Sequence, residues 1–155
     1  MSPLAACLLC LLAILLLIAA VGDIRTRIIP NGLNAAIALL ALPWWYATGL
    51  GGADILFQLL LCGAVLALFA LCFALGMMGG GDVKLLAAIA LWLPLGEMAV
   101  LLVWMALGGG VLTLAMLGAH RIRKSSKQIE IPYGVAIAGA ALMLVTNQLL
   151  TTSVA

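Results

Sequence analysis

The sequence predicts an all-α integral membrane protein built as a bundle of about six transmembrane helices, and three observations lead to this fold class. Hydrophobic residues make up 67% of the 155-residue chain and charged residues only 8%, whereas about a quarter of an ordinary soluble chain is charged. The apolar residues form continuous runs close to the roughly 20 residues that cross a bilayer. These runs also lack the short-range alternation of a transmembrane β-barrel.

Charged and polar residues divide the chain into six apolar runs. The fourth run is short because Pro94 closes it, and it contains Lys84. We expect all six to form one transmembrane domain over residues 1–155, with a retained first helix, because the N-terminal segment lacks the positive region of a signal peptide. The predicted helices are residues 4–21, 33–50, 55–75, 83–93, 98–117 and 134–150.

The positive charges lie only in alternate connections between these runs or, for Lys84, at the edge of one. Cationic residues stay on the cytoplasmic side of a membrane, so we expect a multi-pass protein of the inner (plasma) membrane with both termini outside. A net charge of +2 excludes a nucleic-acid binder that works by neutralising phosphates. The cationic residues are Arg25, Arg27, Lys84, Arg121, Arg123, Lys124 and Lys127.

Several residues within the apolar runs have structural explanations. Cys7 and Cys10 form a C-x-x-C motif inside the first run, without a second pair in a polar loop, so we expect packing residues and no metal site. The Gly-Gly-Gly run at 108–110 predicts a face where helices pack closely. Trp44 and Trp45, together with Tyr46, are typical of an interfacial aromatic belt.

Two of the five carboxylates have unusual surroundings. Asp23 and Asp82 each adjoin a long apolar run, on the same predicted side of the membrane. Asp54 and Glu97 lie at predicted outer helix ends, and Glu130 lies in a basic loop, so we expect all three to be solvated. Because an ionisable group near membrane depth is costly, Asp23 and Asp82 are the candidates for function.

Two carboxylates that converge cannot both ionise at low cost, so one of them retains a proton. The unprotonated group then takes a proton from water, the water attacks a peptide carbonyl, and the protonated group donates to the carbonyl oxygen and then to the leaving nitrogen. We therefore predict an aspartic endopeptidase whose catalytic residues are Asp23 and Asp82. This chemistry requires neither a metal nor a cofactor.

The glycines Gly79, Gly80 and Gly81 directly precede the second of these carboxylates. Glycines let the backbone unwind and remove side chains that would block an extended substrate, so we expect them to contact the substrate. Asp82 is predicted near the start of a helix, where the helix dipole favours the anion, and Asp23 near the end of one. The dipoles alone predict Asp82 as the base and Asp23 as the proton-bearing partner.

Further polar and motif positions leave alternatives open. Lys84 either neutralises the acidic pair, contacts an acidic group of the substrate, or extends to the membrane interface. Asn31 is predicted near the N-cap of the second helix. The motif formed by Pro132, Tyr133 and Gly134 predicts either a simple helix start or a wall of the substrate cleft.

Together these motifs resemble those of the type IV prepilin peptidases, which are membrane aspartic proteases that remove the leader of prepilin-like proteins. The resemblance implies that Asp23 and Asp82 are the essential pair. It also implies a membrane-protein substrate of a type IV pilus or secretion system, with a short basic cytoplasmic leader before a hydrophobic helix. The motifs that carry it are Asp23 with Ile29-Pro30-Asn31, Gly79-Gly80-Gly81-Asp82 with Lys84, and Ile131-Pro132-Tyr133-Gly134.

The chain is similar to the short, peptidase-only members of that family, such as those of Tad-type pili and the preflagellin peptidases. Many full-length members carry a cytoplasmic zinc domain with two C-x-x-C pairs and methylate the new N-terminus. We expect no such domain and no methyltransferase activity in this chain. No pattern in the sequence predicts an oligomeric state.

Other functions are compatible with the same residues. In a transport or channel subunit, Asp23 and Asp82 would be intramembrane ion or proton ligands, and the glycine run would be a broken helix. In a structural assembly factor, the carboxylates would only anchor helix ends. A presenilin-like or signal-peptide-peptidase-like protease would share only the Gly-x-Gly-Asp element.

Overall fold

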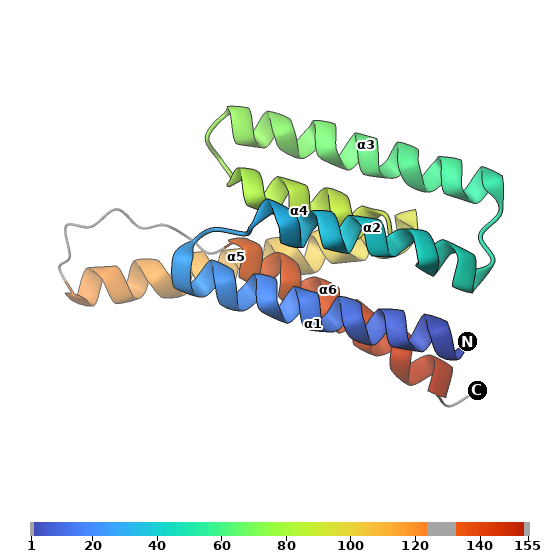
Figure 1. Ribbon diagram of the computed structural model, residues 1–155. Helices are drawn as coiled ribbons and strands as arrows, with labels where there is room; N and C mark the ends of the chain where they lie inside the picture. The colour runs from blue at the N-terminus through green and yellow to red at the C-terminus, as the bar shows by residue number, and fades with distance from the viewer. Residues whose placement is uncertain (1, 124–132, 154–155) are drawn as a thin grey trace.

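The computed structural model describes residues 2–123 and 133–153, and it contains only helices and turns within these ranges. This confirms the predicted all-α bundle and its number of helices (Figure 1). The helices are α1 (Pro3–Thr26), α2 (Asn31–Thr48), α3 (Gly52–Ala74), α4 (Gly80–Ala90), α5 (Leu95–Arg123) and α6 (Tyr133–Ser153).

Every helix begins one to three residues before the apolar run that predicted it, whereas the C-terminal ends differ in both directions. α1, α5 and α6 end after their runs, and α2, α3 and α4 end before theirs. α1 continues through polar residues to Thr26 and ends at Arg27, which adopts the left-handed conformation with φ 57°. α4 begins at Gly80. Pro30 is the N-cap of α2 and Asn31 is the first residue of that helix, so Asn31 lies next to the N-cap as predicted. The apolar runs predict the helix starts too late because backbone hydrogen bonds form wherever the backbone dihedral angles allow, whatever the side chain.

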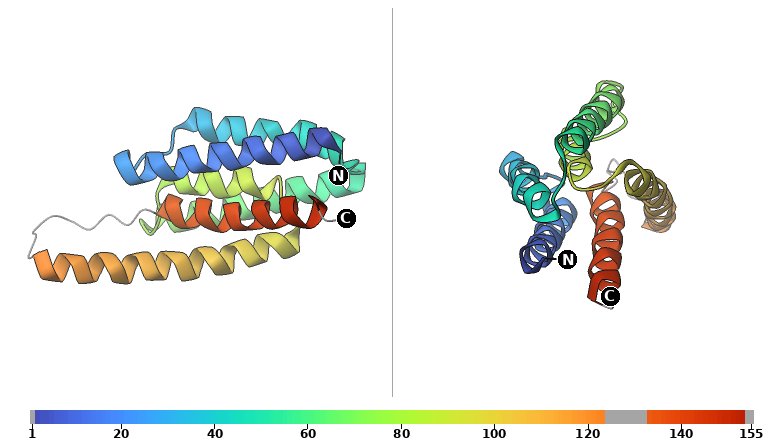
Figure 2. Two further views of the ribbon diagram at one scale, coloured as in Figure 1. Left: turned by 90° about the horizontal axis from the view of Figure 1, so that it is seen from below. Right: turned by 90° about the vertical axis from the view of Figure 1, so that its right-hand side faces the viewer.

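The helices run up and down the bundle, with both chain ends at the same end of the molecule (Figure 1). The α1–α2 and α3–α4 connections lie at the opposite end. The end-on view in Figure 2 shows α4 at the centre, where it packs against α2, α3 and α6. α1 packs against α2 and α6, and α5 packs against α6.

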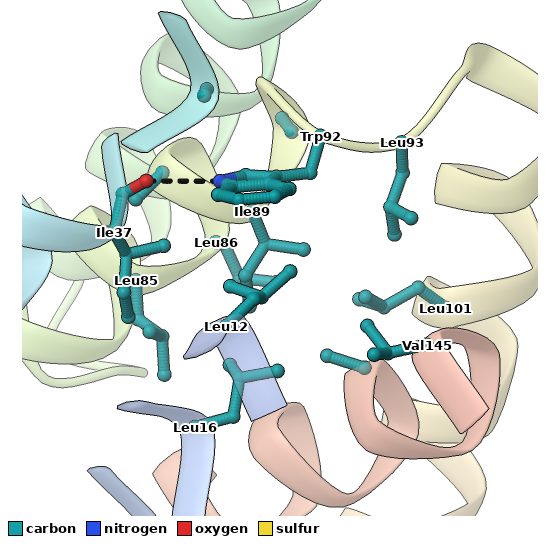
Figure 3. Close-up of a cluster of buried hydrophobic side chains, with 14 of the residues drawn as sticks. Leu12, Leu16, Ile37, Leu85, Leu86, Ile89, Trp92, Leu93, Leu101 and Val145 are labelled. Carbon is teal, nitrogen blue, oxygen red and sulfur yellow. Dashed lines mark hydrogen bonds between the residues drawn. The ribbon is translucent and has the colours of Figure 1, made fainter. Parts of the chain in front are cut away.

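α4 and α3 differ most in burial. Eight of the 11 residues of α4 are buried, whereas Gln58 and Val65 are the only buried residues among the 23 of α3. α4 can be short because protein surrounds it, whereas α3 presents a large apolar surface. Figure 3 shows the core around α4, which includes Leu12, Leu16, Ile37, Leu85, Leu86, Ile89, Trp92, Leu93, Leu101 and Val145.

Side chains from α2 and α3 satisfy the backbone at the C-terminal end of α4. The Gln58 amide donates to the carbonyls of Ala90 and Leu93, both at 2.6 Å. The Trp45 indole donates to the carbonyl of Leu91 at 2.8 Å. The last carbonyls of a helix have no partner within the helix, and unpaired ones are costly away from water. These two side chains therefore allow α4 to end inside the bundle.

The tryptophans of α2 are core residues, which corrects their predicted place at the membrane interface. Trp44 and Trp45 are only 8% and 7% exposed, whereas Tyr46 is 85% exposed. The rings of Trp44 and Trp92 lie with centroids 5.5 Å apart. The Trp92 indole donates to the carbonyl of Ile37 at 2.9 Å (Figure 3). Tryptophan serves an interface or a core equally well when its N–H finds a partner, so composition did not distinguish the two.

Two packing predictions have different outcomes. Cys7 and Cys10 are exposed on α1, so they do not pack within the bundle as expected. The 108–110 glycine run does lie against α6, because a Cβ atom built at Gly108 would lie 3.7 Å from the Cβ of Ala136.

Four helices are long and apolar enough to cross a membrane: α1, α3, the 95–118 part of α5, and the 133–151 part of α6. Large apolar side chains are exposed along them, including Leu17, Leu60 and Leu114. The chain is a multi-pass helical membrane protein. α2 carries two asparagines and a Trp-Trp-Tyr sequence, and α4 is short, so these two helices are less apolar or less extended than the others.

Candidate active site

Asp23 lies in the last turn of α1, on the side that faces the bundle, and is only 5% exposed. α1 ends four residues later, where the Arg27 N–H donates to the carbonyl of Asp23 at 3.0 Å. The left-handed conformation of Arg27 then turns the chain away from the helix. The carboxylate therefore lies where α1 meets the connection to α2.

Asp82 is the third residue of α4 and is 9% exposed. Gly79 is the N-cap of this helix, and Gly80 and Gly81 form its first turn. The glycine run is thus mostly helical, so the expected unwinding is absent from this structure. The first turn of α4 lies at the same end of the bundle as the last turn of α1 (Figure 1).

The two carboxylates line one small pocket of about 200 Å³. They are close enough that the negative charge of Asp23 acts on Asp82. Two carboxyl groups in such surroundings cannot both ionise at low cost. The residues that line this pocket, called the dyad pocket below, are Asp23, Arg27, Ile28, Ile29, Gly79, Gly80, Gly81 and Asp82.

Close approach explains the glycines of the dyad pocket. A Cβ atom at Gly79 would lie 3.0 Å from Oδ2 of Asp82. A Cβ atom at Gly81 would lie 3.2 Å from the Cβ of Ile29, which belongs to the α1–α2 connection. The glycines therefore allow α4 to approach that connection, and this approach brings the two carboxylates to one pocket.

Asn34 links α2 to the first turn of α4 beside the dyad pocket. Its amide donates to the carbonyl of Gly81 at 3.2 Å, and the side chain is only 5% exposed. Sequence reasoning missed this residue, because a single asparagine in an apolar run shows no periodicity or spacing that would distinguish it.

The first residues of α6 also contact the carboxylate of Asp23. The Val135 N–H donates to Oδ2 of Asp23 at 3.1 Å. A Cβ atom at Gly134 would lie 2.8 Å from that oxygen and 2.8 Å from Cδ1 of Ile29. Gly134 therefore packs against the carboxylate of Asp23, although it is not among the residues that line the dyad pocket.

Two further predicted substrate residues, Tyr133 and Lys84, are not among the residues that line the dyad pocket. Tyr133 begins α6, and its ring lies beside Gly109 of α5, where a Cβ atom would come within 3.2 Å of it. Pro132 lies outside the described residues. Lys84 is exposed, and its Nζ donates to Oδ1 of Asn31 at 2.8 Å.

Lys84 and Asn31 line a separate apolar groove of about 330 Å³ between α2, α3 and α4. The dyad pocket and this groove thus lie on different faces of α4. Among the residues that the structure describes, no three His, Cys, Asp or Glu side chains gather in a way that could hold a metal ion.

A family model of the type IV leader peptidases matches residues 10–114, which is more than half of the chain. The chain belongs to the type IV leader peptidase family. The match confirms the resemblance drawn from the sequence motifs, and it makes the chain a peptidase of the leader-peptidase kind. No curated protein and no solved structure matches the chain.

The matched range of the leader-peptidase family contains both carboxylates of the dyad pocket. It ends within α5, so the Asp23 contacts made by Gly134 and Val135 lie beyond it.

Proposed function

We propose that this leader peptidase is an aspartic endopeptidase that removes the short basic leader of type IV prepilin-like proteins, with Asp23 and Asp82 as its catalytic pair. The observation that carries the proposal is the dyad pocket, where two buried carboxylates from α1 and α4 meet. Among the described residues that line it, none is a Ser, Cys, Thr, His or Lys of the kind that serves other hydrolases as nucleophile or base.

The chemistry follows from one proton shared between the two carboxyl groups. The ionised carboxylate takes a proton from a water molecule while that water attacks the scissile carbonyl carbon. The protonated carboxyl donates its proton to the carbonyl oxygen, which gives a tetrahedral gem-diol intermediate. This intermediate breaks as the carboxyl that took the proton from water donates it to the leaving nitrogen and the other carboxylate takes back a proton from the gem-diol. The pair thus returns to its singly protonated state after each turnover, and no covalent intermediate forms because water is the nucleophile.

The glycines Gly79, Gly80 and Gly81 provide a wall of the dyad pocket without side chains. An extended peptide can lie against such a wall because no Cβ atom intervenes. Gly134 packs against Asp23, the Tyr133 ring packs against Gly109 of α5, and Lys84 lines the neighbouring groove.

The membrane orientation follows from the cations near the dyad pocket. Arg25, Arg27 and Lys84 belong to the end of the bundle that carries this pocket. The positive-inside rule places that end in the cytoplasm of the cell and both termini on the outer side of the inner membrane. A substrate with a basic cytoplasmic leader would then present its cleavage site to the dyad pocket.

The test is leader release by the purified chain in lipid nanodiscs. The substrate is a synthetic peptide with a basic leader, a cleavage-site glycine and a hydrophobic helix. We expect Asp23→Asn and Asp82→Asn each to lower kcat/KM by at least about 10³-fold, because the two groups act as one unit. Full activity in either variant would refute the catalytic pair.

Asp54→Asn is the matched control. Asp54 is also a carboxylate in the first turn of a helix, and it accepts from the Gly51 N–H at 3.2 Å at the opposite end of the bundle. We expect wild-type leader release from this variant. Ion flux into proteoliposomes that requires Asp82, without leader release, would instead favour a transport function.

A further inference from the structure

The first turn of α6 holds one oxygen of Asp23. The Val135 N–H donates to Oδ2 at 3.1 Å, and Gly134 packs so closely that an added Cβ would lie 2.8 Å from the same oxygen. Val135 is the third residue of α6. An N–H in the first turn of a helix has no partner within its helix, so this hydrogen bond satisfies a donor that would otherwise be unpaired.

This contact favours the ionised form of Asp23. A helix N-terminus attracts negative charge, and a carboxylate accepts an N–H bond more strongly when it is ionised. Arg27, which lines the same pocket, adds a positive charge that acts on Asp23. Both effects oppose the dipole of α1, whose C-terminal end alone would disfavour a charge on Asp23.

Asp82 has different neighbours. It lies in the first turn of α4, where the dipole and the nearby Gly79 backbone favour a charge. The charged side chain that acts on it is Asp23, which is negative. Once Asp23 is ionised, ionisation of Asp82 would place a second negative charge in the dyad pocket. Asp82 is therefore the group that retains its proton.

We infer that the first turn of α6 is a third component of the site, which positions Asp23 and makes it the catalytic base, leaving Asp82 as the proton-bearing partner. The inference rests on the proposed function and reverses the assignment that the dipoles of α1 and α4 alone predict. With Oδ2 bonded to Val135, Oδ1 of Asp23 is the oxygen that remains to accept the proton of the attacking water.

Val135→Pro tests the hydrogen bond directly. Proline removes the N–H, and proline is tolerated in the first turn of a helix because no intrahelical bond is lost there. If Asp23 is the base, we expect the acid limb of the kcat/KM–pH profile for leader release to move to higher pH by about one unit. Val135→Ala keeps the N–H and should leave the profile in place.

The direction of the shift identifies the role of Asp23. Loss of a donor that stabilises the anion makes Asp23 hold its proton to higher pH. A base then loses activity on the acid side, whereas an acid would retain activity further on the alkaline side. Movement of the alkaline limb alone would overturn the assignment, and an unchanged profile would overturn the involvement of α6. A wild-type chain without leader release would refute the proposed function instead.

Gly134→Ala tests the positioning role independently. The added methyl group must displace Asp23 or Ile29, and a misplacement of about 1 Å can cost roughly 100-fold in rate. We expect kcat to fall by about 10- to 100-fold with KM nearly unchanged. Gly139→Ala is the control on the same helix, because its added Cβ would meet nothing within 4 Å. Equal activity of the two variants would contradict the positioning role.

Discussion

The two Gly-Gly-Gly runs of this chain, at 79–81 and 108–110, have the same sequence and different surroundings. The first run begins α4 and lies against the side chains of Asp82 and Phe73, and Gly81 also lies against the backbone of Ile29 in the α1–α2 connection. The second lies in the middle of α5 and faces side chains of α6, namely Tyr133 and Ala136. Glycine thus makes room for the two carboxylates of the dyad pocket in one place and for a helix interface in the other.

The difference shows that the cost of replacing a glycine depends on what lies opposite. A backbone segment cannot move without moving the elements attached to it, whereas the end of a side chain can rotate away. Substitutions along the two runs should therefore separate into a group that affects leader release and a group that affects only stability. Three predictions follow this order, from the largest effect to the smallest.

Gly81→Ala should have the largest effect. Its Cβ would lie 3.2 Å from the Cβ of Ile29 and 3.4 Å from the carbonyl oxygen of that residue. The α1–α2 connection would have to shift, and the two carboxylates would separate. We expect kcat/KM for leader release to fall by about 10- to 100-fold. Activity near that of the wild type would show that the close approach of α4 is dispensable.

Gly109→Ala should have an intermediate effect. Its Cβ would lie 3.2 Å from Cε1 of the Tyr133 ring, and a forced packing change of this kind costs about 1–3 kcal/mol. Tyr133 precedes the turn that holds Asp23, so we expect leader release to fall by a few-fold besides the loss of stability. Thermal unfolding in nanodiscs and kcat/KM measure the two effects. A loss of activity equal to that of Gly81→Ala would remove the distinction between the two runs.

Gly110→Ala should have the smallest effect. An added Cβ at this position would meet nothing within 4 Å, and alanine has the higher helix propensity by up to about 1 kcal/mol. We expect unchanged leader release and a transition temperature that is equal or slightly higher. A marked loss of stability would indicate that this face of α5 is covered in the membrane.

The sequence predicted the helices and the candidate pair because both depend on patterns along the chain. Long apolar runs identify helices in a membrane protein, and Asp23 and Asp82 are conspicuous beside such runs. The helix ends were less accurate, since α1 continues through Asp23 itself to Thr26. The shared position of the two carboxylates in one pocket was a hypothesis that only the packing of α1 against its neighbours could test.

Other features left no pattern in the sequence. The Val135 contact uses a backbone N–H, which every residue except proline possesses. Trp44 and Trp45 are as compatible with a membrane interface as with a core, and only the carbonyl of Leu91 and the ring of Trp92 explain their burial. A mean hydropathy cannot separate α3, which faces outward, from the core of the bundle, because lipid and protein interior are both apolar.

The buried centre of α4 also governs where water can go. Leu85, Leu86 and Ala90 are 0% exposed, and Gln58 and Trp45 close the carbonyl end of the helix. A hydrolase inside a membrane needs water at its carboxylates and must still keep the two aqueous compartments apart. Because the middle of α4 is closed to solvent, we expect water to reach the two carboxylates only from the end of the bundle that carries the dyad pocket. Hydrolysis would then open no path for protons across the membrane.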